Sequence, residues 1–406
     1  MSLEKFDQTQ MPVATADLAP TFPLPQELII DILLRLPTKS IGKFRLVSKP
    51  WHSLLYDPLF IKAHLAFHLD DQEKLIILYS SSGTPAFKYF TTYFSTATFP
   101  TPNNYVRISE KLNPLLENPL SSARIVSCNG LVLVANDGLR RREFSSKHLL
   151  ALDTMYLVNP TTMEHLRLPK GPFNLVVGNA GVAFGYDSFN DDYKIIWSYG
   201  GTTIRRSENF VIVFSLRNGT CRRLYNCPYA PTTHSGVCLN CSVHWLAQSK
   251  VDESQVIAAL DLSTEEFKQV PWPSTGCSTR NWGSLASSKQ LLVLGGCLAM
   301  VVEQSSQQMD IWMMKDYGVA ESWTKFGVII PKLVGHYYKP ICLLGEDDVV
   351  LDKNGQNLVV HNLRDGTTRE MLVAGINRDA FRDVGCFLES LVSPTFYSQK
   401  WRATSF

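Results

Sequence analysis

One stretch of the sequence has the spacing of metal ligands: Cys238-Leu-Asn-Cys241, followed closely by His244. Cysteine thiolates and histidine imidazoles are preferred ligands of zinc, and a structural zinc site takes four of them. This stretch supplies three and lacks a clear fourth, whereas zinc sites usually combine two such pairs. Its residues are therefore better interpreted as ordinary thiols of strands and turns. We predict no bound metal and no cofactor.

A second group of candidate ligands is acidic. Asp187, Asp191 and Asp192 lie within the stretch GYDSFNDDYK, and carboxylates grouped in this way can hold calcium. A calcium loop of the EF type also needs a glycine and a glutamate at fixed later positions, and both are missing here. The pattern favours a solvated turn.

The familiar patterns of catalytic sites are missing from the sequence. It lacks the G-x-S-x-G, H-E-x-x-H and G-x-G-x-x-G motifs and a Gly-rich phosphate loop. Its nine histidines form no cluster, and a Ser–His–Asp set cannot be recognised from spacing alone. We therefore predict a protein that is not an enzyme.

Composition points to a folded protein without a nucleic-acid or membrane partner. The 406 residues are 45% hydrophobic and 19% charged, and 39 basic residues nearly balance 37 acidic ones. The first 22 residues are polar and lack the apolar core of a secretory signal, while the longest apolar stretch, 291–302, is too short to cross a bilayer. The nine cysteines are then best interpreted as reduced thiols. We expect a soluble protein of the cytoplasm, the nucleus or both.

The front of the chain holds more apolar residues than a short helical segment can bury. Seven of the nine positions from Leu28 to Leu36 are Leu or Ile. Proline and Ser/Asp signals divide residues 24–68 into three or four short helices, with Ser40, Ser48 and Asp57 as candidate N-caps. So small a bundle shelters one face of each helix. The surplus indicates either a protein–protein interface or burial against the rest of the chain.

From about residue 72 onward, short runs rich in Val, Ile, Leu, Tyr and Phe alternate with clusters of turn residues. This pattern is typical of many short antiparallel strands. Five segments repeat one form: a strand, a polar turn, Ser or Thr, three further residues, then an apolar residue that opens a second strand. Their anchors are Thr162/Leu166, Thr220/Leu224, Ser263/Phe267, Ser322/Phe326 and Thr367/Met371.

The repeat predicts an all-β propeller. Its spacing matches the length of a four-stranded blade, and each copy corresponds to the third and fourth strands of one blade. We predict about six blades, with five or seven as alternatives. Closure of the ring should pair the last strands, around residues 385–394, with strands near residues 75–80, because a closed ring leaves no exposed edge.

The order of residues in LPQELIIDILLRLPTKSIGKFRLVSKPWHSLLYDPLF closely resembles the F-box, a helical motif that docks on a Skp-type adaptor of cullin-RING ubiquitin ligases. Several elements match in order and spacing. The resemblance implies that the adaptor-binding surface is formed or supported by Leu24, Pro25, Leu28, Ile32, Leu36, Pro37, Ile41, Val47 and Trp51. Of these, the two prolines mainly shape turns, and Trp51 is equally well interpreted as a core residue.

The rest of the chain also resembles a known family. The stretches CNGLVLV, LVNPTT, AFGYDSFNDDYKII, VHWLAQ and ESLVSP are similar to the F-box-associated domain of plant F-box proteins, some of which are described as F-box/kelch-repeat. Paired glycines of the kelch type occur only at 200–201 and 295–296, so kelch-like describes the shape. We predict four parts: a disordered tail (1–22), an F-box helical module (23–68), an F-box-associated propeller (72–395) and a C-terminal tail (396–406).

Together the resemblances imply a substrate receptor of an SCF-type ligase, whose propeller binds an unidentified target protein and whose F-box reaches the cullin and RING subunits through the adaptor. The alternative is a propeller enzyme, of glycosidase or oxidase type, with helices packed against it. Aromatic and Arg residues in predicted loops are candidate target contacts, because such residues are enriched at binding hot spots. They are Arg141, Arg205, Arg206, Trp272, Arg280, Trp282, Tyr317 and Tyr337.

Overall fold

The computed structural model describes most of the chain between residues 24 and 398, and the statements below concern these residues. The described ranges are 24–69, 71, 74–80, 87–92, 105–106, 108–112, 123–136, 155–168, 179–200, 210–225, 227–233, 236–273, 289–303, 308–329, 338–355, 357–373 and 381–398.

The front of the chain folds into four short helices, α1 (Gln26–Leu34), α2 (Thr38–Phe44), α3 (Lys49–Leu55) and α4 (Pro58–Phe67). The predicted caps of α3 and α4 are confirmed. The Ser48 side chain accepts a hydrogen bond from the backbone N–H of Trp51, and Asp57 Oδ1 accepts one from Leu59 N at 2.7 Å. In both helices a proline occupies the first turn, where the missing N–H costs nothing.

The predicted cap of the second helix is wrong. Ser40 lies inside α2, because the helix already begins at Thr38, directly after Pro37. The backbone N–H of Ser40 donates to the carbonyl of Pro37 at 2.8 Å, so the first turn begins three residues earlier than a Ser40 cap would place it. Pro37 fixes its own φ at −55° and so starts the helix without a side-chain cap.

The remainder of the described chain is almost entirely β-strand, with one short 3₁₀ helix, η4 (Ala320–Ser322). The strands are β1 (Lys74–Ser80), β2 (Phe87–Thr92), β3 (Tyr105–Val106), β4 (Ile108–Leu112), β5 (Ala123–Cys128), β6 (Leu131–Asn136), β7 (Met155–Val158), β8 (His165–Arg167), β9 (Asn179–Asp187), β10 (Asp192–Gly200), β11 (Phe210–Ser215), β12 (Thr220–Leu224), β13 (Tyr229–Pro231), β14 (Val237–Leu239), β15 (Ser242–Ser249), β16 (Gln255–Asp261), β17 (Phe267–Val270), β18 (Lys289–Leu294), β19 (Cys297–Glu303), β20 (Gln308–Met314), β21 (Trp323–Ile329), β22 (Tyr338–Leu344), β23 (Asp348–Lys353), β24 (Asn357–Asn362), β25 (Thr368–Val373) and β26 (Phe381–Phe387).

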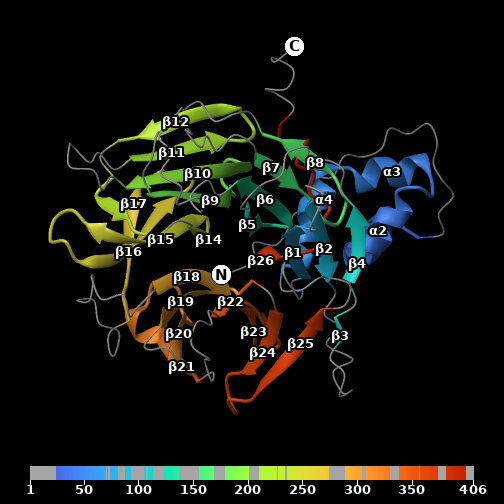
Figure 1. Cartoon of the computed structure of the whole chain (residues 1–406). Coiled ribbons are helices and arrows are strands. Elements are labelled where there is room, and N and C mark those ends of the chain that lie inside the picture. The colour runs from blue at the N-terminus through green and yellow to red at the C-terminus, as the bar shows by residue number, and fades with distance from the viewer. Residues whose placement is uncertain are drawn as a thin grey trace.

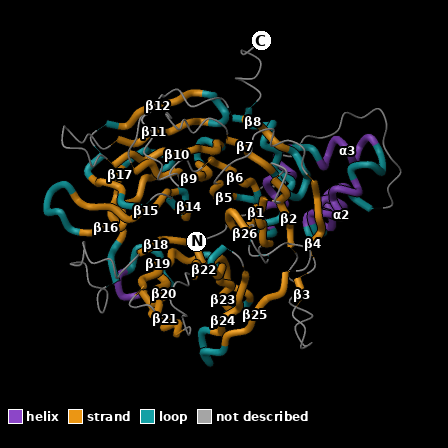
Figure 2. Tube along the Cα trace, viewed as in Figure 1, coloured by secondary structure: helices purple, strands orange, loops and turns teal. Residues whose placement is uncertain are grey.

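These strands form sheets of four or five strands that follow one another around a ring (Figure 1). Their orders are β26-β1-β2-β4, β5-β6-β7-β8, β9-β10-β11-β12, β13-β15-β16-β17 with β14 beside β15, β18-β19-β20-β21, and β22-β23-β24-β25-β3. The prediction of a propeller with about six blades is confirmed. The tube in Figure 2 shows the helices gathered at one side of the ring.

The five repeated segments occupy the positions predicted for them. They form the hairpins β7–β8, β11–β12, β16–β17, β20–β21 and β24–β25, which are the third and fourth strands of their sheets. The predicted closure of the ring is also confirmed, although the closing strand ends at Phe387 and residues 388–394, which were expected to belong to it, form no strand. The innermost strand of the first sheet is β26, and it pairs antiparallel with β1, with Leu75 opposite Cys386 and Ile77 opposite Val384.

Ring closure places the chain that follows β26 between the propeller and the helices. We call residues 388–398 the C-terminal strap. Within it, Leu391 is 2% exposed and belongs to the core of the helical module, together with Leu33, Ile41 and Leu55. The Asn159 side chain, in the second blade, donates hydrogen bonds to the strap carbonyls of Ser390 and Val392, at 2.9 and 2.7 Å. The strap therefore belongs to both halves of the molecule.

Helix α4 makes the reciprocal contact. Leu65 is buried in the core between the second and third blades, alongside Leu157, Phe184 and Trp197. A side chain from the propeller end of the chain enters the helical core, and a side chain from the helices enters the propeller core. Because each half buries apolar surface of the other, the halves hold one orientation.

We predict that Leu391→Ala destabilises the helical module by about 2–5 kcal/mol, because the substitution leaves a cavity in a small core. Limited proteolysis and urea denaturation should show earlier loss of the helices. Leu46→Ala is the matched control, since Leu46 is 87% exposed and the same atoms are removed from its surface. Equal stability of the two variants would contradict a structural role for the strap.

Candidate protein-interaction surfaces

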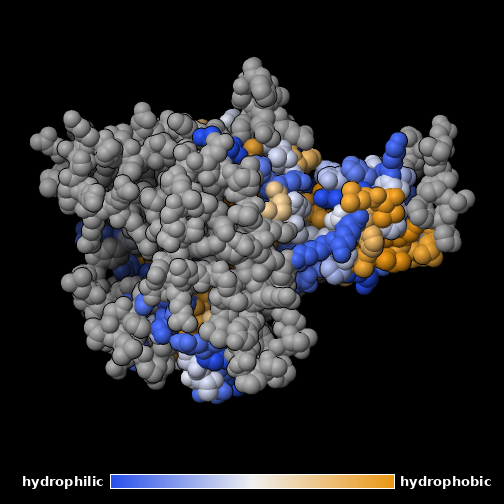
Figure 3. Space-filling model, turned by 45° about the vertical axis from the view of Figure 1, so that its right-hand side comes forward, coloured by the Kyte–Doolittle hydropathy of each residue, from blue (hydrophilic) through white to orange (hydrophobic). Residues whose placement is uncertain are grey.

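The outer side of α1 carries apolar side chains that no other part of the described structure covers. Leu28 and Ile32 are 50% and 49% exposed, and Leu24 is similarly exposed one turn earlier. The opposite side of the helix buries Ile30, Leu33 and Leu34. We call Leu24, Leu28 and Ile32 the α1 face. Figure 3 shows apolar residues gathered over the helical arm that projects from the ring.

The structure separates the predicted adaptor-binding residues by exposure. The α1 face and Val47 are exposed, and Pro25 and Pro37 stand exposed at the starts of α1 and α2. Other predicted residues are more enclosed. Leu36 and Trp51 are partly buried against the helical core, where the Trp51 ring meets Phe44 edge to face at 5.4 Å.

Ile41 is fully buried, so it supports a surface from beneath and cannot contact a partner directly. The Leu/Ile pattern alone could not place it, because its burial depends on how α2 packs against the other helices. Sequence reasoning also missed Leu46, which is more exposed than any residue of the α1 face. The sequence feature that could have identified Leu46 as exposed is its position next to Val47, in the turn that follows α2. The binding role of all these residues stays a prediction.

Two histidines of α4 hold the end of α1. His64 Nε2 lies 2.9 Å from the carbonyl oxygen of Leu36, and His68 Nε2 lies 3.0 Å from that of Leu34. Leu34 is the last residue of α1, and the last carbonyls of a helix have no partner within it, so the His68 N–H satisfies that carbonyl from outside. His64 holds the carbonyl of Leu36, two residues after the helix. Burial lowers the pKa of His64 to about 4 and keeps its ring neutral. The spacing of four residues on α4 could have suggested that the two rings share one side of the helix.

An ionic network joins α4 to the third blade. Lys62 Nζ lies 2.7 Å from Asp191 Oδ2, and Asp191 Oδ1 accepts hydrogen bonds from the hydroxyls of Tyr186 and Tyr397, at 2.7 and 3.1 Å. The Arg217 guanidinium also pairs with this carboxylate. Burial opposes ionisation of Asp191, but the hydrogen bonds and charges of Lys62 and its other partners outweigh it and lower its pKa.

The prediction of a solvated acidic turn is wrong for Asp187 and Asp192, which are 0% and 3% exposed. The buried ammonium of Lys194 lies 2.9 Å from Asp187 Oδ2 and 3.5 Å from Glu265 Oε1 of the next blade, and Ser263 Oγ donates to Asp187 Oδ1 at 2.7 Å. Burial opposes ionisation of Asp187, but hydrogen bonds from Asn190, Lys194 and Ser263 lower its pKa to about 2. The carboxylates of Asp187, in the third blade, and Glu265, in the fourth blade, thus hold the two blades together through Lys194 and Ser263.

The stretch that resembles a metal site forms the strands β14 and β15 and the turn between them. His244 is buried, and its Nε2 lies 2.5 Å from the Tyr317 hydroxyl, while Cys241 Sγ lies 3.1 Å from Ser188 Oγ. Within the described ranges, no group of three or more His, Cys, Asp or Glu residues is arranged to hold a metal ion. No described helix is long and apolar enough to cross a membrane.

Two of the candidate target-binding residues are described. Tyr317 is 40% exposed, although its hydroxyl is engaged by His244. Trp272 packs partly buried against the core between the fourth and fifth blades, with the Lys289 ammonium 5.3 Å from the centre of its ring. The remaining candidates lie outside the described residues: Arg141, Arg205, Arg206, Arg280, Trp282 and Tyr337.

Comparison with protein families gives two matches that together cover most of the chain. Residues 23–62 match the model of the F-box domain, and residues 76–387 match the model described as the F-box associated beta propeller domain. The first match covers α1 to α3 and the start of α4, and the second begins within β1 and ends with β26.

Similar proteins from Arabidopsis thaliana extend over nearly the same length. An F-box/kelch-repeat protein is 27% identical over 392 residues, which are 91% of this chain and 96% of the relative. F-box protein CPR1 is 28% identical over 371 residues, which cover 84% of this chain and 82% of that protein. The helical module and the ring therefore occur together in these relatives.

The anchoring of α1 predicts a pH dependence. His64 has a pKa of about 4 in the folded protein and of about 6.5 without its surroundings, so the unfolded chain binds the proton more readily. Stability should therefore fall as the pH drops from 6.5 towards 4, by about 3 kcal/mol for a shift of this size. Urea denaturation at several pH values measures this slope.

His64→Gln should flatten the slope, whereas His52→Gln, at an exposed position of α3, should leave it as in the natural chain. His244, whose pKa burial also lowers to about 4, contributes a slope of the same sign that both variants keep. The same slope in the His64→Gln variant and the natural chain would show that His64 does not hold the helices in this way.

Proposed function

Because the chain belongs to the family of F-box proteins that carry an F-box associated beta propeller domain, we propose that it is the substrate-recognition subunit of an SCF-type, cullin-RING ubiquitin ligase. The observation that carries the proposal is the uncovered α1 face. Three large aliphatic side chains are each about half exposed: Leu28 and Ile32 on α1, and Leu24 just before it. The opposite side of the helix buries Ile30, Leu33 and Leu34. Exposed apolar surface of this kind on a small module marks a protein-binding site.

The partner of the α1 face in this proposal is a Skp-type adaptor, which links the chain to cullin and RING subunits. Burial of the three side chains would supply about 25 cal/mol for each Å² of apolar surface removed from water. Leu46 and Val47 are exposed on the same module and extend the apolar surface available to the adaptor. Trp51 and Ile41 would support this surface from within the helical core.

The receptor would do no covalent chemistry. Its contribution is positional: a bound target protein is held at high effective concentration beside the ligase's charged ubiquitin carrier. This role needs a defined geometry between the two binding regions. The contacts of Leu391 and Leu65 across the junction, and the ion pair of Lys62 with Asp191, support a fixed geometry.

The target would bind the face of the ring turned away from α4. The turns that follow β5, β9, β14 and β18 line the space next to α4, so these strand ends mark the near face. Most candidate target residues lie in segments that connect strand ends on the opposite face, since neighbouring strands are antiparallel. Tyr317 is the exception, because the β20–β21 turn belongs to the near face.

A place in the cytoplasm or the nucleus is part of the same proposal. No disulfide joins the described cysteines, and Cys227 is a buried thiol. This state suits a reducing compartment, where disulfides are rare.

We predict that Leu28→Ala combined with Ile32→Ala weakens binding of a purified Skp-type adaptor by several kcal/mol, about 2 or more for each residue if both lie in the dry centre of the interface. Isothermal titration measures the effect. Tyr225→Ala combined with Val251→Ala, at exposed positions on the propeller, is the matched control and should bind as the natural chain does. Unchanged affinity in the α1 variant, with its helices intact by circular dichroism, would contradict the assignment.

The same α1 variant should separate the two binding events. Its propeller is unchanged, so it should still bind the target while failing to deliver it to the ligase. We expect the target to accumulate, and an excess of the variant to inhibit degradation. Co-precipitation followed by a chase of target abundance tests this. Loss of target binding by the folded variant would show that the target site spans both halves.

A further inference from the structure

A cavity of about 910 Å³ lies between α4, the C-terminal strap and the near face of the propeller. Its walls are mainly apolar. Ile61, Leu65 and Leu69 line it from α4 and the turn after it, and Val392 and Phe396 line it from the strap. Binding sites for small molecules are often cavities of this size and character, formed where two domains meet.

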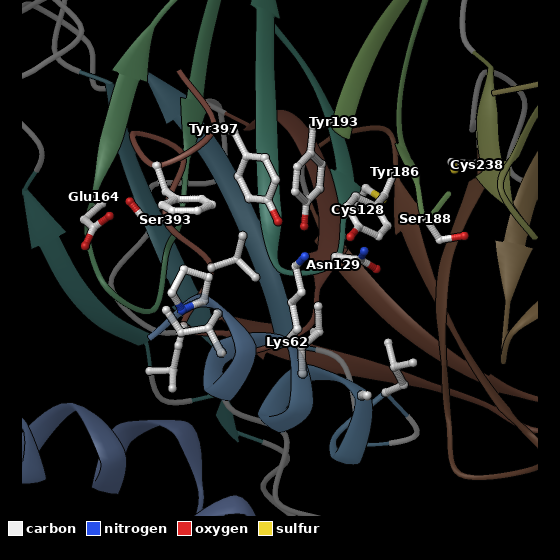
Figure 4. A pocket seen from close by; sticks show the side chains of 18 of the residues that line it. Lys62, Cys128, Asn129, Glu164, Tyr186, Ser188, Tyr193, Cys238, Ser393 and Tyr397 are labelled. Atoms are coloured by element: carbon white, nitrogen blue, oxygen red, sulfur yellow. The ribbon is translucent and has the colours of Figure 1, made fainter. Parts of the chain in front are cut away.

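The side of the cavity opposite α4 carries three tyrosines, two from β9 and β10 and one from the C-terminal strap. Tyr186, Tyr193 and Tyr397 stand side by side along this side, with their hydroxyls towards α4 (Figure 4). Burial, the largest cause, and contact with Asp191 raise the pKa of Tyr186 and of Tyr397, so both phenols stay neutral. Tyr193 and Tyr397 are 1% and 6% exposed and pack ring against ring, so they present mainly their hydroxyl edges to the cavity. The apolar surface open to a ligand is that of Ile61, Val392 and Phe396.

One cation faces into this apolar space. Figure 4 shows Lys62 rising from α4 into the cavity, with its ammonium group below the tyrosine hydroxyls. Lys62 pairs with Asp191, which is shared with Arg217, so two cations compete for one carboxylate. An ammonium group has three N–H donors. Among the described residues, the ion pair with Asp191 uses one of them, so an anionic group in the cavity can share this ammonium group.

The remaining charges of the wall do not cancel this cation. Arg45 and Glu164 both line the far end of the cavity and interact with each other electrostatically. Arg45 also stacks on the Tyr56 ring at 4.0 Å and donates to the carbonyl of Leu55 at 3.0 Å. The wall as a whole therefore favours a negative group next to Lys62.

We propose that this cavity binds a small amphipathic molecule, with an apolar body against the apolar side chains of α4 and the strap and one anionic group on Lys62, below the tyrosine hydroxyls. Such a ligand would touch α4, the strap and the blade turns at the same time. Its binding would strengthen the orientation between the helical module and the propeller. The inference does not depend on the adaptor, because the cavity is formed by this chain alone.

Two dyes of similar shape test the proposal on the full chain. 8-Anilinonaphthalene-1-sulfonate carries a negative charge, and N-phenyl-1-naphthylamine is its neutral counterpart; both fluoresce when they enter an apolar site. We expect saturable binding of both at one site. The anionic dye should bind about fivefold more tightly, as expected for one partly screened charge pair worth about 1 kcal/mol.

Three variants locate the site. Ala66→Trp fills the cavity from the exposed side of α4 and should weaken both dyes about tenfold or more. Gln269→Trp adds the same ring at an exposed position of β17, outside the cavity, and should bind as the natural chain does. Lys62→Gln keeps a donor for Asp191 but removes the charge, so it should weaken the anionic dye to the affinity of the neutral one.

Three results would overturn the proposal. The first is unchanged binding of both dyes to Ala66→Trp, and the second is equal affinity of the two dyes for the natural chain. The third is dye binding that appears only after residues 1–20 are removed, since this would make the chain's own N-terminal segment the occupant. Lys62→Gln leaves the apolar walls intact, so it tests the charge even if the Trp variant folds poorly.

Discussion

The pairing of β26 with β1 is the constraint on which the rest of the structure depends. The ring of sheets closes because the last strand of the chain completes the first sheet, and the register from Lys74 to Tyr79 fixes that pairing. Closure also determines where the chain goes next. It delivers Leu391 to the helical core and Ser390 to the Asn159 side chain. Fold, junction and cavity thus follow from one pairing.

Two ion pairs lie at the joints between parts of the molecule. Lys194 joins the third and fourth blades through Asp187 and Glu265, and Lys62 joins α4 to Asp191. A buried charge that loses its partner costs several kcal/mol, so each pair penalises other arrangements of the same elements. Apolar packing supplies most of the stability, and these pairs make one arrangement specific.

The sequence predicted what depends on local patterns. Five hairpins, their place in the blades, the closing strand and two helix caps followed from spacing and turn chemistry. Apart from the misplaced cap of α2, its errors concern contacts between distant residues. Asp187 looked solvated because its partner Ser263 lies 76 positions away, and no spacing rule reveals the burial of Ile41 or the insertion of Leu391. The cavity likewise exists only where three separate segments meet.

The helical module packs against the propeller on one side and leaves apolar surface uncovered on the other, and these two surfaces together explain its excess of Leu and Ile. About 45 residues are near the lower limit for a domain that folds unaided. On its inner side the module gains Leu391 and the ion pairs of the junction, and on its outer side it leaves the α1 face uncovered. Binding of an adaptor there would add buried apolar area to a module that has little of its own. The interface would then complete the fold of the module as well as link it to the ligase, so adaptor affinity and module stability are expected to be coupled.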